Sequence, residues 1–190
     1  MSDVYLGRLP ILDTKQNVVA YELLFRADHH NKAIVANNSA ASANVIIETY
    51  GQLGIDNVIG KRRGFIKVDA QLLMHDSILL LPKKHVVLEI LRGVEITESI
   101  TQRCAFLKQK GYQLALSYTA QSSTHYDHIL SLVNIVNINV NELTSAHLIA
   151  VMKQLRRFPI LLLAEKVETQ ETAKHCISLN FQMLQGFFFI

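Results

Sequence analysis

The chain has few cysteines, which can form cross-links, and few prolines, which are frequent in linkers between domains. It contains two cysteines, Cys104 and Cys176, which lie far apart and match no metal-ligand spacing. Both fall on helical patterns, so we expect buried free thiols. Proline occurs three times in 190 residues, and no proline-rich segment marks a linker. We therefore expect a single domain over residues 1–190.

The sequence also lacks a segment suited to a membrane or to nucleic acid. Its longest apolar run, Ser77–Pro82, is far too short to span a bilayer. The N-terminal residues show no basic-then-apolar signal pattern. The formal charge is +3, and Lys61–Arg63 is the tight basic cluster, whereas a nucleic-acid surface normally has a longer basic stripe with aromatic residues. We expect a cytoplasmic protein with neither kind of partner.

Short apolar runs alternate with helical patterns along most of the chain. The expected strands are Tyr5–Leu12, Val18–Arg26, Gly64–Val68, Val86–Leu91, Tyr112–Leu116, Ile135–Asn139, Ile160–Ala164 and Met183–Phe189. The expected helices are Ser39 to about Leu53, Ala70–Leu80, Thr97–Lys110, Ser122–Leu132, Glu142–Arg157 and Thr169–Leu179.

The order of these elements predicts an α/β fold, a TIM-like (β/α) barrel. The later strands are continuous runs of Val, Ile and Leu, as expected when both faces are buried. The short connection between the first two strands predicts a hairpin and hence an antiparallel first pair. The alternative is an open doubly wound sheet, which would need a glycine-rich phosphate loop after an early strand. The sequence has no such loop.

The sequence stops inside an expected strand, at Gly186–Ile190, without the C-terminal helix that would close such a barrel. Three Phe and an Ile at this edge would present an apolar surface. Because such surfaces are usually covered, we expect another segment of the protein, or another subunit, to pack there.

Polar residues gather where the expected strands end, which is where (β/α) barrels carry their chemistry. They are Glu22, Lys67, Glu89, Ser117, Asn137, Asn139, Glu165, Glu168 and Gln185. Glu22 interrupts the apolar run Val18–Arg26, where an unpaired carboxylate is costly. Glu22, Glu89 and Glu165 would share one mouth, either as oxygen ligands for Mg²⁺ or a similar cation or as ion-paired structural residues. Spacing alone leaves both interpretations open.

Four segments in the same order resemble the EAL domain family, whose active members are cyclic di-GMP phosphodiesterases. VVAYELLFR resembles the signature strand, with Glu22 at the position of its Glu. VVLEIL resembles the Leu-Glu-Ile-Thr-Glu strand, LLAEKVET the Ala-Glu-Gly-Val-Glu-Thr segment, and LQGFFF the Gln-Gly-Tyr-Leu-Phe strand. YELLFR and AEKVET in particular look like the EAL-like half of two-part proteins in which an HDOD domain follows.

The resemblance implies a barrel with an antiparallel first strand pair. In active members it implies two cations, Mg²⁺ or Mn²⁺, that activate water for attack on one phosphodiester bond. By the same resemblance, Glu22 and Glu89 stand at metal-ligand positions, Glu165 and Glu168 match the acidic pair, and Gln185 matches the Gln before Gly.

Other positions depart from the family's pattern. The metal-binding Asn falls on Lys67, the metal-bridging Asp–Asp pair on Ser117 and Tyr118, and the Lys and Asp of the Leu-Lys-Ile-Asp strand on Asn137 and Asn139. Each lost catalytic interaction typically costs a few kcal/mol. We therefore expect no catalytic residues, no metal cofactor and no phosphodiesterase activity.

These departures predict a degenerate, catalytically inactive regulatory module that acts through protein–protein contacts. The expected partner is a second copy of the chain or a following HDOD-like domain. The alternatives are a metal-independent cyclic di-GMP receptor and an active phosphodiesterase. If the chain is an inactive module, we expect Lys67 to replace the metal and to form a mostly buried cluster with Glu22 and Glu89.

Overall fold

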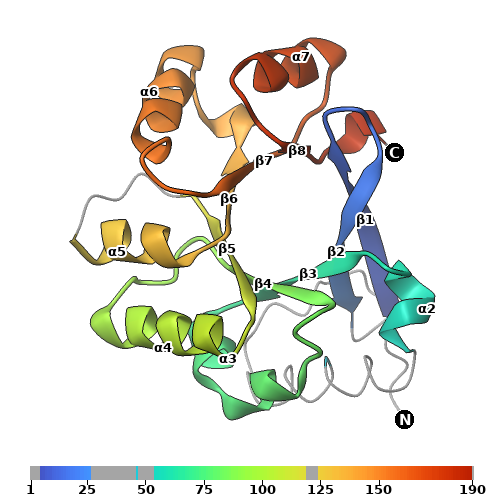
Figure 1. Cartoon of the computed structure of the whole chain (residues 1–190). Coiled ribbons are helices and arrows are strands. Elements are labelled where there is room, and N and C mark those ends of the chain that lie inside the picture. The colour runs from blue at the N-terminus through green and yellow to red at the C-terminus, as the bar shows by residue number, and fades with distance from the viewer. Residues whose placement is uncertain (1–4, 27–45, 47–53, 119–123, 190) are drawn as a thin grey trace.

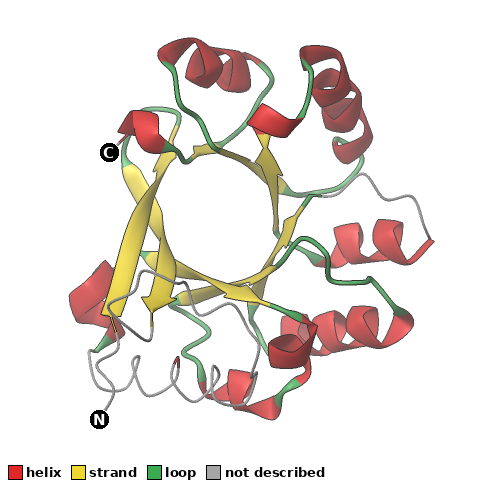
Figure 2. Ribbon diagram, turned by 180° about the vertical axis from the view of Figure 1, so that it is seen from behind, coloured by secondary structure: helices red, strands yellow, loops and turns green. Residues whose placement is uncertain are grey.

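The protein is a closed eight-stranded barrel ringed by helices (Figure 1). The structure is a computed structural model that describes residues 5–26, 46, 54–118 and 124–189. The strands follow one another around the barrel in chain order, and β8 pairs with β1 to close it. The view from behind shows the helices outside the ring of strands (Figure 2). The predicted TIM-like (β/α) barrel is confirmed.

Most elements lie within two residues of their expected bounds. The strands are β1 (Tyr5–Asp13), β2 (Val18–Arg26), β3 (Arg63–Val68), β4 (Val86–Ile90), β5 (Gln113–Ser117), β6 (Ile135–Asn139), β7 (Leu161–Glu165) and β8 (Met183–Leu184). The α-helices are α2 (Ile55–Ile59), α3 (Ala70–Met74), α4 (Glu98–Gln109), α5 (Thr124–Leu132), α6 (Ser145–Leu155) and α7 (Gln170–Ser178). Short 3₁₀ helices are η1 (Asp76–Leu80), η2 (Val140–Glu142) and η3 (Phe187–Phe189).

The first strand runs against both of its neighbours. β1 is antiparallel to β2 and to β8, whereas every pair from β2–β3 to β7–β8 is parallel. The β1–β2 turn is tight because Asp13 Oδ1 accepts hydrogen bonds from the backbone N–H groups of Lys15 and Asn17, at 2.8 Å each. The predicted antiparallel first pair is therefore confirmed.

Two expected helices differ from the structure, and a third lies almost entirely outside the described residues. The helix expected over Ala70–Leu80 is split into α3 and η1, because His75 is extended and its Nδ1 accepts the N–H of Ser77. The helix expected from Glu142 begins at Ser145, after Thr144, whose hydroxyl accepts the N–H of His147. The helix expected from Ser39 to about Leu53 lies outside the described residues except for Ile46, which is helical.

The last expected strand, Met183–Phe189, is wrong in its second half. β8 ends at Leu184, and η3 follows it. The reason is a close approach of two backbones: Val167 donates to the carbonyl of Gln185 at 3.0 Å, and Phe188 donates to the carbonyl of Val167 at 3.3 Å. These bonds bend the chain around the end of β7 in place of a longer strand.

The barrel interior begins with an apolar layer that takes one residue from each strand. It consists of Ile11, Ala20, Phe65, Val87, Ala115, Ile135, Leu163 and Met183, all buried. A larger core lies between the strands and the surrounding helices. Because successive side chains of a strand alternate between faces, residues two positions further along each parallel strand also point into the barrel.

Cys104 and Cys176 are buried free thiols in α4 and α7, as expected. Burial raises the pKa of Cys104 to about 12 and that of Cys176 to about 11, so neither is an activated nucleophile. In the described part of the chain, no helix has the length and apolar character needed to cross a membrane.

Among the described glycines with a close neighbour, Gly186 is the one at which an added Cβ would come nearest to other atoms. A Cβ there would lie 2.0 Å from the carbonyl oxygen of Val167. We expect Gly186→Ala to lower the free energy of unfolding by about 3 kcal/mol or more, because backbone must move to admit the methyl group. Urea unfolding followed by circular dichroism measures the change.

Gly7→Ala is the matched control in β1. A Cβ at Gly7 meets its nearest neighbour, Leu24 Cβ, at 3.5 Å, an ordinary contact. We expect a change within about 0.5 kcal/mol for this variant. Equal stability of the two variants would contradict the close packing of Gly186 on Val167.

Candidate functional site

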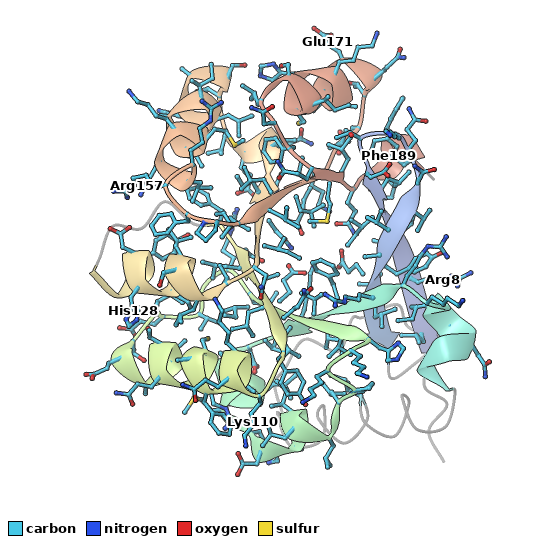
Figure 3. The ribbon with its side chains drawn as sticks, in the orientation of Figure 1. Arg8, Lys110, His128, Arg157, Glu171 and Phe189 are labelled. Atoms are coloured by element: carbon cyan, nitrogen blue, oxygen red, sulfur yellow. The ribbon has the colours of Figure 1, made fainter. Side chains whose placement is uncertain are left out.

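A layer of polar side chains lies directly above the apolar layer, at the C-terminal ends of the parallel strands. We call it the polar layer; it consists of Glu22, Lys67, Glu89, Ser117, Asn137, Glu165 and Gln185. Each member stands two residues after a member of the apolar layer, which explains why all of them point inward. Figure 3 shows side chains from the strands filling the inside of the barrel.

Glu22 has two partners in this layer. Its side chain is buried, with the residue 6% exposed. Oε1 lies 2.7 Å from the ammonium of Lys67, and Oε2 accepts a hydrogen bond of 2.7 Å from Nε2 of Gln185. The carboxylate that interrupts the apolar strand is therefore compensated on both oxygens.

Lys67 reaches one carboxylate and not two. The expected contact with Glu22 is present, but Glu89 lies beyond ion-pair distance of the Lys67 ammonium, and the Lys67 side chain is 38% exposed. The expectation of a mostly buried three-residue cluster is thus wrong for Lys67 and Glu89. Burial alone would lower the pKa of Lys67, but the nearby charges of Glu89, Glu22 and Glu165 outweigh it and raise this pKa.

Glu89 is the most deeply buried carboxyl group of the layer. The residue is 2% exposed, and its Oε1 accepts a 2.9 Å hydrogen bond from the Ser117 hydroxyl. Burial, reinforced by the charge of Glu165, raises the pKa of Glu89 to about 7. Burial also raises the pKa of Glu165. One lysine therefore does not offset three glutamates in this layer.

Asn137 has an incomplete set of hydrogen bonds. It is 1% exposed, and its Nδ2 donates to Oε1 of Glu165 over a long 3.4 Å. Its Oδ1 is one of two buried side-chain polar atoms without a partner in the described part of the chain. Such a group carries a desolvation cost.

Three predicted site residues lie outside the polar layer. Tyr118 is the residue after Ser117 and so faces away from the barrel interior; its ring packs edge-to-face on Tyr126 at a centroid distance of 6.5 Å. Asn139 lies one step above the layer, where its Nδ2 donates to Glu142 at 2.7 Å. Glu168 is exposed in the loop before α7.

Sequence reasoning missed two features at the C-terminal ends of the strands. Arg92, which follows β4, forms an ion pair with Glu142 of η2 and so bridges across the end of β5. Lys166, next to Glu165, has a φ of 62°, a region that favours glycine. The second feature had a signal: Lys166 stands at the Gly position of the Ala-Glu-Gly-Val-Glu-like segment.

The residues of the polar layer do not fit a divalent cation. The Lys67 ammonium occupies one oxygen of Glu22, Gln185 donates to the other, and Ser117 donates to Glu89. In the described residues no cluster of three or more His, Cys, Asp or Glu has a metal-binding arrangement. The geometry therefore matches the ion-paired alternative better than the oxygen-ligand one.

The fold and the site define a class of protein: a (β/α) barrel with an antiparallel first pair and an acidic mouth. The family model described as the EAL domain matches residues 9–190. The chain belongs to the EAL domain family.

Two curated relatives are each 30% identical to this chain. The uncharacterized protein YuxH of Bacillus subtilis (strain 168) matches over 98% of the chain and 46% of its own length. The cyclic di-GMP phosphodiesterase CdgJ of Vibrio cholerae serotype O1 matches over 100% of the chain and 44% of its own length. The chain thus spans less than half the length of these relatives.

Solved structures share the fold. The Bacillus subtilis YkuI protein, with an EAL domain and in complex with the substrate cyclic di-GMP and calcium, has a TM-score of 0.77 at 22% identity. The match covers 99% of this chain and 54% of that one. At this identity the likeness shows the common barrel architecture.

Lys67→Met should destabilise the protein, because it leaves the buried Glu22 without its cation. We expect a loss of about 1–2 kcal/mol in the free energy of unfolding, since Lys67 is partly exposed. The double variant Glu22→Gln with Lys67→Met should lose less than the single one. Chemical denaturation measures both, with Lys84→Met, an exposed lysine, as the control. A double variant less stable than Lys67→Met would disprove the pairing.

Glu89 should make stability fall as the pH rises. Its pKa is about 7 in the folded state against an ordinary 4.5, so between these values the folded protein holds a proton that the unfolded chain releases. Raising the pH from about 5 to about 8 should therefore remove about 1–3 kcal/mol through this group. Glu89→Gln, which still accepts from Ser117, should flatten this part of the profile.

The measurement is thermal unfolding of wild type and Glu89→Gln across that pH range. The difference between the two curves isolates Glu89 from other titrating groups. A difference that grows in favour of wild type as the pH rises would contradict the direction assigned to this carboxyl group.

Proposed function

We propose that this EAL domain is a non-catalytic regulatory module of cyclic di-GMP signalling that acts through protein–protein contacts. The observation that carries the proposal is the ion pair between Lys67 and Glu22, at 2.7 Å. An ammonium ion holds the carboxylate that, by family resemblance, would bind a metal. A cation at that place would meet direct electrostatic repulsion.

The rest of the polar layer supports the same proposal. Two-metal hydrolysis needs acidic oxygens between the two cations to hold both the attacking and the leaving oxygen of the phosphodiester. At the position of the Asp pair, Ser117 donates its hydroxyl to Glu89, and Tyr118 packs outside the barrel. Neither side chain supplies a carboxylate to bridge two metals.

The connection to cyclic di-GMP rests on the relatives. CdgJ is named a cyclic di-GMP phosphodiesterase, and YkuI was solved with this dinucleotide. In this chain, phosphates entering the mouth would meet Glu22, Glu89 and Glu165, with Lys67 as the cation of the polar layer. That charge balance opposes a metal-free receptor, the second candidate function.

The apolar surface at η3 supports a protein partner. Phe187 is 69% exposed and Phe188 39% exposed, and exposed aromatic pairs favour protein contacts. The two curated relatives are more than twice as long as the matched region. We propose that an HDOD-like domain, as the sequence resemblance suggests, or a second copy of the chain covers this surface.

The protein should not hydrolyse cyclic di-GMP with Mg²⁺ or Mn²⁺. Chromatographic detection of the linear dinucleotide measures turnover, with CdgJ as the positive control and Glu22→Ala as the background. Restoring acidic residues by Ser117→Asp with Tyr118→Asp should not produce activity, because Lys67 still neutralises Glu22.

Calorimetric titration with cyclic di-GMP, with and without Mg²⁺, separates the candidate functions. No binding in either case agrees with a protein-contact module. Saturable metal-free binding would assign a receptor, and product above the Glu22→Ala background would overturn the absence of catalysis.

A further inference from the structure

A small cavity opens beside the polar layer. Its volume is about 100 Å³, and its charged lining consists of Glu22, Lys67, Glu165 and Lys166. Leu9 and Phe187 belong to its apolar wall. The cavity thus lies between β1, the ends of β2, β3 and β7, and η3, which packs near β1 and β2 where Phe189 is labelled in Figure 3.

Some of the charged groups around the cavity are already satisfied. Glu22 uses one oxygen for Lys67 and the other for Gln185. Lys67 has three N–H donors, and its contact with Glu22 uses one of them. Among the described residues Glu165 accepts one long hydrogen bond, from Asn137 to Oε1, and the charges of Lys67 and Lys166 lower its pKa against the larger effect of burial. Two ammonium groups and one carboxylate therefore retain binding capacity at this cavity.

Lys166 holds an unusual backbone conformation at this place. Its φ of 62° is costly for a residue with a β-carbon. Within the described residues its side chain has no hydrogen bond or ion pair, although its charge acts on Glu165 and lowers the pKa of that carboxyl group. The strained backbone sets a lysine on the wall of the cavity, at a position where the resembled family segment has glycine.

We propose that this cavity binds a free α-amino acid of about the size of alanine, with its carboxylate on Lys67 and Lys166 and its ammonium on Glu165. The ligand supplies one anionic group for the two lysines and one cation for the Glu165 carboxylate. Leu9 and Phe187 receive its short side chain.

Size and charge separate this ligand from a cyclic dinucleotide. A cavity of about 100 Å³ is larger than a single water molecule needs and has room for a ligand of a few non-hydrogen atoms. The pockets that bind drug-sized ligands have volumes of about 300–1,000 Å³. A zwitterion matches a lining of both signs. Two phosphates would instead face Glu165 without any positive group of their own to pair with it.

Titration calorimetry with glycine, L-alanine and L-serine tests the proposal, in a buffer free of carboxylates and primary amines. Propionate and ethylamine are the matched probes, since propionate is alanine without its ammonium group and ethylamine is alanine without its carboxylate. We expect saturable binding of L-alanine, and affinities for propionate and ethylamine lower by about tenfold or more.

Lys166→Gly tests the residue that carries the argument. Glycine adopts a φ of 62° without strain, so the variant should unfold near the wild-type temperature while its affinity for L-alanine falls by about tenfold or more. Lys153→Ala removes an exposed lysine of α6 and should bind as wild type does.

Three results would overturn the site. They are no saturable heat with any of the three amino acids, unchanged affinity in Lys166→Gly, and equal affinity for L-alanine and propionate. This outcome is independent of the cyclic di-GMP assays, because neither hydrolysis nor dinucleotide binding enters the measurement.

Discussion

The need to compensate a buried carboxylate in the barrel mouth connects the other features of this structure. Glu22 lies in β2 and receives its two partners, Lys67 and Gln185, from β3 and from the residue after β8. Gln185 is 163 residues away in the chain, and it arrives only because β8 pairs with β1 and closes the barrel. The hydrogen bond to the second oxygen of Glu22 therefore depends on closure of the sheet.

Among the described residues of the polar layer, one lysine faces three carboxyl groups. It brings one positive charge to a layer that holds three carboxyl groups, and it satisfies the first of them directly. The remaining two, Glu89 and Glu165, respond by holding protons more tightly, because burial penalises their charged forms. The chain thus has the barrel architecture of the EAL family, and burial raises the pKa of two carboxyl groups in its mouth.

Much of the fold and the membership of the polar layer were predictable, and the partners within the layer were not. Lys67 lies opposite Glu89 in the β3–β4 register, yet its ammonium pairs with Glu22. Glu89 takes its hydrogen bond from Ser117 on the next strand. Such choices depend on the tilt of the strands and the reach of each side chain. The bend after Leu184 was equally hidden, because it arises from backbone contacts with Val167.

The sequence by itself determined most of the strands, the start of most helices and the inward face of each strand, because these follow from the alternation of neighbouring residues and from side chains that bond within a few positions. Thr97 and Thr169, for example, are the first residues of two expected helices, and they are the N-caps of α4 and α7. Only the tertiary structure decided that Lys67 stays partly exposed, that the Tyr118 ring packs on Tyr126, and that Lys166 borders a cavity. These outcomes depend on distances between strands far apart in the chain, and no local pattern encodes them.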